Sequence, residues 1–121
     1  MTDYKDLIVW QKSMDLVEEI YALTSKLPDN EIYALSNQMR RAVVSLPSNI
    51  AEGNGRSTGK DYVKFLTIAR GSKSELETQL YICLRLKYLT PEQTEKAFVL
   101  CAEIGRMLNS LINKIKLIPN P

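Results

Sequence analysis

The chain has 121 residues, of which 45% are hydrophobic and 25% are charged, and its formal net charge is +2. This composition fits one globular domain over the whole chain and excludes a disordered protein, since domains typically contain about 100 to 150 residues. No apolar run approaches the roughly 18 residues that a membrane helix needs, and the first residues lack the layout of a signal peptide, so we expect a cytoplasmic protein.

The charges are unevenly distributed along the chain. Residues 1–31 contain seven acids and three bases, a net charge of −4. Residues 40–73, called the basic segment below, contain seven bases and two acids, a net charge of +5. The seven bases are Arg40, Arg41, Arg56, Lys60, Lys64, Arg70 and Lys73. Such a segment suggests an anionic partner, either a phosphate backbone or the acidic part of another copy of the chain.

Four stretches have the apolar periodicity of amphipathic helices, at about residues 7–27, 31–53, 58–88 and 91–116. The first stretch contains two neighbouring apolar rows. One row consists of Val9, Leu16, Ile20, Leu23 and Leu27, and the other of Trp10, Met14, Val17, Tyr21 and Thr24. Because one row is enough to cover a core, the second predicts either central burial of this helix or a second contact surface.

Several residues are expected to interrupt these helices. Pro47 lacks the amide that would bond the carbonyl of Val43, so we expect a kink or a break, with Pro47 opening a short last segment. Gly53 and Gly55 are expected to have the positive φ angles of a helix C-cap and turn. An interior glycine costs about 1 kcal/mol relative to alanine, so another backbone is expected to pass close to Gly71.

The third and fourth stretches begin with clear capping signals. Thr58 and Asp61 have the spacing of a capping box, and Thr90, Pro91 and Gln93 form the strongest helix start in the chain. There is no alternating strand pattern in the sequence. Four amphipathic helices joined by short turns therefore predict an all-α fold, an antiparallel up-down-up-down four-helix bundle.

The side-chain chemistry argues against an enzyme. Histidine is absent, which removes the commonest general base, the serine and cysteine triads and the Glu-x-x-His motif of a di-iron bundle. The carboxylates Glu52, Glu75 and Glu77 alone are a weak metal signal. Cys83 and Cys101 have no metal-ligand spacing and are expected to lie in the core. We therefore expect no catalytic site, no metal and no cofactor.

Two polar rows place an arginine and a glutamate on the same helical face. Arg41 and Glu52 share a row in the second stretch, and Arg70 and Glu77 share one in the third, with Glu75 nearby. One interpretation is that these residues form ion pairs between helices that fix the register. The other is that the bases contact phosphates, each releasing about 0.9 counterion from duplex DNA. Both interpretations stay open at this point.

Several motifs in order resemble the four-helix-bundle proteins encoded in intervening sequences of bacterial 23S ribosomal RNA genes. The motifs are residues 6–12 (Asp-Leu-Ile-Val-Trp-Gln-Lys), 38–42 (Gln-Met-Arg-Arg-Ala), 48–53 (Ser-Asn-Ile-Ala-Glu-Gly), 65–72 (Phe-Leu-Thr-Ile-Ala-Arg-Gly-Ser) and 75–77 (Glu-Leu-Glu). The similarity extends over about residues 4–115. It implies a four-helix bundle that assembles as a ring-shaped homopentamer and binds nucleic acid. The family includes accessory proteins of diversity-generating retroelements, in which the ring partners a reverse transcriptase.

Two functions are therefore expected. The first is a non-catalytic oligomer that binds RNA or DNA through the seven bases of the basic segment. The second is a protein scaffold or accessory subunit that docks a protein partner such as a reverse transcriptase. In the second case the basic segment would serve self-assembly or docking.

Overall fold

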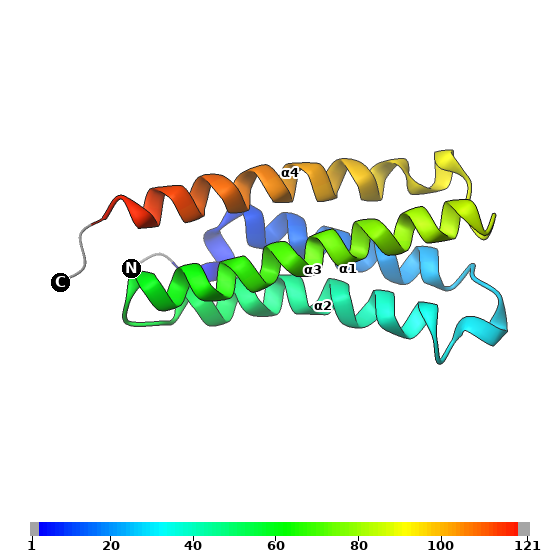
Figure 1. Cartoon of the computed structure of the whole chain (residues 1–121), viewed down its shortest axis with the longest axis horizontal. Coiled ribbons are helices and arrows are strands. Elements are labelled where there is room, and N and C mark those ends of the chain that lie inside the picture. Colours follow the sequence, from blue (N-terminus) through cyan, green and yellow to red (C-terminus); the bar gives the residue numbers. More distant parts are fainter. Residues whose placement is uncertain (1–2, 119–121) are drawn as a thin grey trace.

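The structure is a computed structural model that describes residues 3–118. Four α-helices make up most of it (Figure 1). They are α1 (Ile8–Thr24), α2 (Leu35–Asn54), α3 (Gly59–Arg85) and α4 (Pro91–Lys116), with short 3-10 helices at Tyr4–Asp6 and Asp29–Glu31. No strand occurs within residues 3–118. The largest departure from the predicted ranges is at α2, which was expected to begin near residue 31.

Consecutive helices run in opposite directions and pack side by side. α2 packs against α1 and α3, and α4 packs against the same two helices, so α1 lies diagonally across the bundle from α3. Figure 1 shows that the α2–α3 turn, the start of α1 and the end of α4 lie at one end of the bundle. That end is called the α2–α3 end below. The predicted antiparallel up-down-up-down bundle is confirmed.

All four helices contribute fully buried apolar side chains to one core. Examples from successive helices are Leu16, Leu46, Leu76 and Ile104. Each such side chain stabilises the fold by about 1.5–3 kcal/mol relative to an exposed one. In α4, Ala97, Cys101, Ile104 and Leu108 follow one another at steps of four, three and four residues and are buried in the same core. Of the two apolar rows named from the sequence in the first stretch, the row of Val9, Leu16, Ile20, Leu23 and Leu27 is the one that faces the core.

Pro47 does not end α2. The prediction that Pro47 opens a separate last segment is wrong, because α2 runs unbroken from Leu35 to Asn54. Side chains next to the missing amide bond the backbone of this turn: Ser48 Oγ donates to the Val44 carbonyl at 2.7 Å, and Asn49 Nδ2 donates to the Ser45 carbonyl at 2.8 Å. Pro47 itself is buried, so its ring contributes to packing. Neither of these two bonds reaches the Val43 carbonyl, so burial of the Pro47 ring, rather than a replacement hydrogen bond, is what favours proline at this position.

The predicted helix start at Thr90 is confirmed in full, whereas at Thr58 the predicted cap is present without the reciprocal bond to the Asp61 carboxylate. Thr58 Oγ1 accepts from the amide of Asp61 at 3.1 Å at the start of α3. At the start of α4, the Gln93 amide donates to Thr90 Oγ1 at 3.2 Å and the Thr90 amide donates to Gln93 Oε1 at 2.9 Å, a complete capping box. These signals depend only on residues three apart, which is why the sequence showed them.

The glycines have roles other than those predicted. No glycine among residues 3–118 has a positive φ, and Gly55 ends α2 with φ −84°. Gly53 instead lies against α3, where an added Cβ would be 2.9 Å from the Cβ of Phe65. Gly71, which was expected to face a close backbone, has nothing within 4 Å of an added Cβ and is exposed. Both predictions about φ and the prediction about Gly71 are therefore wrong.

The two cysteines are buried free thiols with raised pKa values. Burial, assisted by the Glu31 carboxylate, raises the pKa of Cys83 from 9.0 to about 11, and burial with the Glu77 carboxylate raises the pKa of Cys101 to about 12. We expect neither thiol of the folded protein to react with a disulfide reagent near pH 8, because the thiolate is the nucleophile. Both are expected to react after denaturation in guanidinium chloride.

A rapid reaction of either thiol in the native protein would contradict this placement in the core.

The raised pKa values of the two thiols also predict a pH dependence of stability. An unfolded thiol ionises above about pH 9, whereas the folded thiols stay neutral, so the free energy of unfolding is expected to fall as the pH rises from about 9 towards the folded pKa of Cys83, about 11.

Candidate nucleic-acid interface

The seven bases of the basic segment do not form one continuous surface. Arg40 points towards α1, where its Nε donates to Thr24 Oγ1 at 2.9 Å and its guanidinium carbon lies 4.8 Å from the centre of the Tyr21 ring. Arg70 points towards α4 and donates from Nη1 to Asn109 Oδ1 at 3.0 Å. Arg40 therefore lies over the α1–α2 interface and Arg70 over the α3–α4 interface, and these two interfaces are on opposite sides of the bundle.

Lys73 is largely enclosed between α3 and α4. Its side chain is 16% exposed, and its Nζ bonds Glu77 Oε1 at 3.0 Å. The same side chain lies over Gly105 of α4, where a Cβ would be 3.2 Å from the Lys73 Cε and Nζ. Gly105 thus makes room for the lysine. An ion-paired lysine in this position has little surface left for an external phosphate.

Arg56 lies in the turn between α2 and α3 and is held on two sides. Its Nη2 bonds Glu52 Oε1 at 2.5 Å, and its guanidinium carbon lies 4.6 Å from the centre of the Phe65 ring. The Arg56 side chain is still 42% exposed. The guanidinium therefore has a fixed orientation and one open side, with part of its charge neutralised by Glu52.

The predicted ion pairs between α2 and α3 are replaced by other contacts. Glu52 pairs with Arg56 and Glu77 pairs with Lys73, each within four residues along the chain. Glu75 accepts from Gln79 Nε2 at 3.3 Å. Between the helices, the hydroxyls of Ser45 and Ser72 form a hydrogen bond at 2.9 Å. Within residues 3–118, Arg41 and Arg70 make no ion pair.

Of the seven bases of the basic segment, Arg41, Lys60 and Lys64 are exposed and have no ion pair or side-chain hydrogen bond within the described part of the chain. Arg41 lies apart from the two lysines. Gly53 lies beside the first turns of α3, and Arg41 precedes Gly53 by twelve residues in α2. Because a helix rises about 1.5 Å per residue, Arg41 lies about 18 Å away from the start of α3 along the bundle. Lys60 and Lys64 lie in the first turns of α3, at the α2–α3 end.

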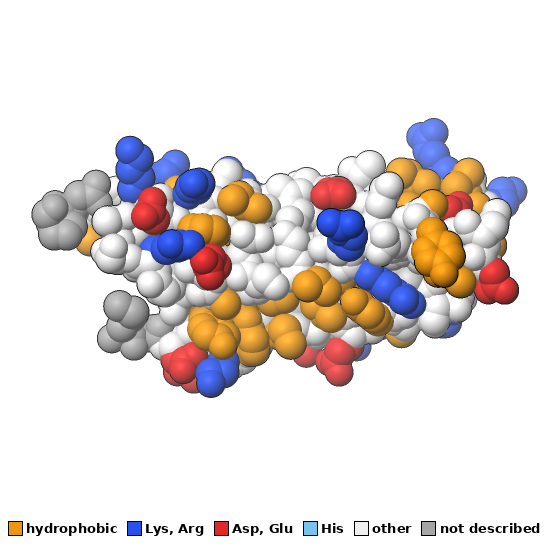
Figure 2. Space-filling model, turned by 90° about the horizontal axis from the view of Figure 1, so that it is seen from below, with side chains coloured by type: hydrophobic (Ala, Val, Ile, Leu, Met, Phe, Trp, Pro, Cys, Tyr) orange, Lys and Arg blue, Asp and Glu red, His pale blue; other side chains and the backbone are white. Residues whose placement is uncertain are grey.

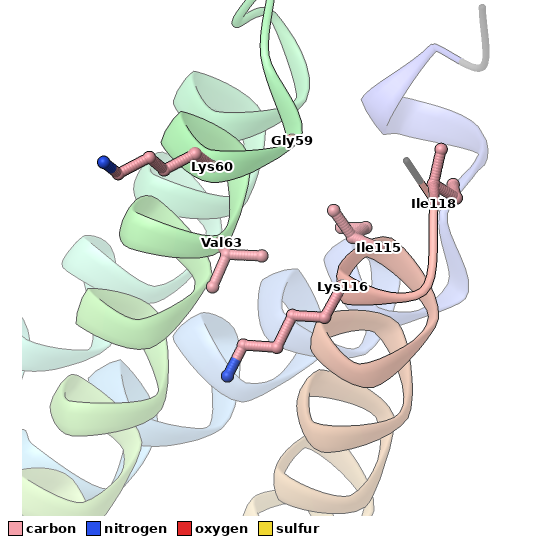
Figure 3. A pocket seen from close by; sticks show the side chains of 6 residues that line it. All are labelled: Gly59, Lys60, Val63, Ile115, Lys116 and Ile118. Atoms are coloured by element: carbon pink, nitrogen blue, oxygen red, sulfur yellow. The ribbon is translucent and has the colours of Figure 1, made fainter. Parts of the chain in front are cut away.

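The last turn of α4 adds two more lysines to that end. Lys60 and Lys116 line the same pocket of about 240 Å³, together with Val63, Ile115 and Ile118. Figure 3 shows Lys116 extending across the space between α3 and α4, whereas Lys60 points away from it. Lys114 is exposed in the same last turn. The exposed lysines Lys60, Lys64, Lys114 and Lys116 are called the basic end below.

The sequence analysis did not assign Lys114 and Lys116 to a binding surface. A signal for them was present, because an up-down-up-down topology necessarily brings the end of α4 beside the start of α3. The basic end is not purely cationic, since Asp61 is exposed in the first turn of α3. Figure 2 accordingly shows basic and acidic side chains together at the left, the α2–α3 end.

A second surface feature is an apolar strip along α1 and α2. It consists of Trp10, Met14, Val17, Tyr21 and Val44. Met14, Tyr21 and Val44 are each 40–42% exposed, while Trp10 and Val17 are partly buried against the core. Figure 2, in which α2 faces the viewer, shows apolar side chains in a strip along the lower part of the view. The second apolar row of α1 is therefore not buried at the centre of the bundle, since Thr24 is its one buried member. Its exposed side chains leave a surface that a partner could contact.

Neither a metal site nor a membrane-spanning helix is found among the described residues. Residues 3–118 contain no group of three or more His, Cys, Asp or Glu side chains that could hold a metal ion. In the same part of the chain, no helix combines the length and the apolar character that crossing a membrane requires.

This architecture defines the chain as a small all-α protein, an antiparallel four-helix bundle. More narrowly, it belongs to the family of 23S rRNA-intervening sequence proteins, whose family model matches residues 5–110. A solved structure of a protein of unknown function from the S23 ribosomal protein family of Bacteroides thetaiotaomicron is similar. It is 29% identical, with a TM-score of 0.81, covering 87% of this chain and 98% of that one. No curated protein sequence matches this chain significantly.

Proposed function

We propose that this protein is a non-catalytic nucleic-acid-binding protein in which the basic end contacts phosphates. The observation that carries the proposal is that Lys60 and Lys116, which are more than fifty residues apart in the sequence, both line one pocket. Lys64 lies one turn after Lys60 in α3, Lys114 lies in the last turn of α4 with Lys116, and both side chains are exposed. Exposed lysines keep their charge and rotational freedom, which suits contact with a phosphate backbone of any sequence.

The proposal includes assembly of several copies. The apolar strip would be covered by a second copy of the chain, and charge supports that occupant, because residues 1–31 carry −4 whereas the basic segment carries +5. In a ring-shaped homopentamer, the assembly expected from the family resemblance, each subunit would present its basic end on the same face. Several weak phosphate sites on one assembly would then bind a single nucleic acid together.

Fluorescence anisotropy with labelled RNA and DNA over a salt series tests the phosphate contacts. The logarithm of the association constant should fall linearly with the logarithm of the salt concentration. Lys60→Gln combined with Lys116→Gln should weaken binding and make the slope shallower by roughly 1.4–1.8, since about 0.7–0.9 counterion is released per phosphate contact.

Lys26→Gln combined with Lys96→Gln is the matched control. Both residues are exposed near the opposite end of the bundle and the change in net charge is the same. The control should leave the slope unchanged. Absence of binding at low salt, a flat salt dependence, or an equal loss in both double variants would overturn the proposal.

A further inference from the structure

The orientation of Arg56 suggests a role other than phosphate contact. Phe65 supports one face of the guanidinium at 4.6 Å, and Glu52 bonds its edge. The carboxylate neutralises part of the charge that a phosphate contact would use. A planar cation fixed in this way, with its side chain 42% exposed, instead resembles the arginine planes on which unpaired bases stack.

A pocket lies beside this plane. It has a volume of about 330 Å³ and is lined by Arg56, Asn54, Thr58 and Tyr62, with Leu7 and Leu111 as its apolar part. Asn54 Nδ2 donates to the Tyr62 hydroxyl at 3.2 Å, which orients the amide at the rim. Apolar walls with a few fixed polar groups are the usual lining of a site for a small planar ligand.

This pocket adjoins the basic end. Gly59, the first residue of α3, lines both the pocket beside Arg56 and the pocket between Lys60 and Lys116. A nucleotide chain passing over the start of α3 could therefore place a base at Arg56 and its neighbouring phosphates near the lysines.

We propose that Arg56 is a stacking platform for an unpaired base, so that the basic end prefers single-stranded to duplex nucleic acid. The inference rests on the proposed function and adds the class of ligand to it. Bases in a duplex are paired and stacked on one another, so their faces cannot reach Arg56, whereas an unpaired base can turn outward. Lysines alone would bind both forms through the backbone.

Arg56→Lys tests the proposal because it keeps the charge and removes the plane. Affinities would be measured for a single-stranded RNA and for a blunt-ended duplex of that strand and its complement at one salt concentration. We expect the wild type to favour the single strand, and Arg56→Lys to weaken that binding about 5- to 150-fold, the range for loss of one stacked base. Affinity for the duplex and the salt slope should not change.

Arg85→Lys is the matched control, since Arg85 is an exposed arginine at the end of α3 far from the pocket, and it should change neither affinity. A 2-aminopurine base in the single strand gives a second readout, because its fluorescence should fall on binding to the wild type and not on binding to Arg56→Lys. Equal affinities for single strand and duplex, or an unchanged single-strand affinity in Arg56→Lys, would overturn this inference and leave the proposed function standing. Absence of salt-dependent binding to either nucleic acid would overturn both.

Discussion

Replacing Gly53 by alanine is expected to lower the free energy of unfolding by about 1–3 kcal/mol, the usual range for overpacking a well-packed site. An added Cβ would lie 2.9 Å from the Cβ of Phe65, 3.0 Å from Cδ1 of Tyr62 and 3.2 Å from the Tyr62 carbonyl oxygen. Two of these atoms belong to or adjoin the α3 backbone, so neither can move without shifting the helix. Equilibrium denaturation in urea, followed by circular dichroism, measures the change.

Gly71→Ala is the matched control, since it makes the same chemical change in the interior of α3. Nothing lies within 4 Å of a Cβ at Gly71, so alanine should raise the free energy of unfolding by about 0.5–1 kcal/mol through its higher helix propensity. A loss of stability at Gly71, or a gain at Gly53, would show that the helix contacts differ from those described. A loss at Gly71 confined to high protein concentration would place a neighbouring copy against α3.

The two glycines show where sequence reasoning reached its limit. A glycine within a helical pattern is compatible with a positive φ, a close neighbour or an open surface, and the pattern alone does not separate these cases. Gly53 needs its small size because of residues nine and twelve positions further along, on a different helix. Gly71 has no close neighbour at all. The distinction depends on how helices dock, which local sequence does not encode.

Local features, by contrast, could be predicted well. The caps at Thr58 and Thr90 depend on residues three positions apart, and the buried rows of α1 and α4 depend on helical periodicity. Pro47 is the exception among local signals, because α2 continues through it and its ring is buried in the core. The propensity rule therefore failed where tertiary packing outweighed the loss of one backbone hydrogen bond.

The candidate site could be predicted only in part. A charge count along the sequence identified the basic segment, but it treated Lys73 like Lys60, although one is enclosed beside Gly105 and the other is exposed. It also placed Lys116 outside the site, because residues distant in sequence become neighbours only through the topology. Linear charge density is therefore a guide to the presence of a cationic surface and a poor guide to its members.

Met14→Lys combined with Val44→Lys is expected to convert an assembly of copies into monomers. Both side chains are exposed in a single chain, at 40% and 42%, so the fold should tolerate lysine there. Inside an apolar interface each ammonium group would lose its hydration without gaining a partner, which costs several kcal/mol. Association should weaken by at least a hundredfold, since each 1.4 kcal/mol changes a constant tenfold. Light scattering coupled to size-exclusion chromatography measures the mass.

Ala22→Lys is the control for this variant, because Ala22 is exposed on α1 and is not part of the apolar strip. It should leave the mass of the assembly unchanged, and circular dichroism should show the same helix content in all three proteins. A strip variant that retains the wild-type mass would show that copies meet through another surface. A wild type that is monomeric at tens of micromolar would remove the second copy as the occupant of the strip and would favour docking of a different protein, since an apolar surface of this kind is uncommon on a chain that stays alone.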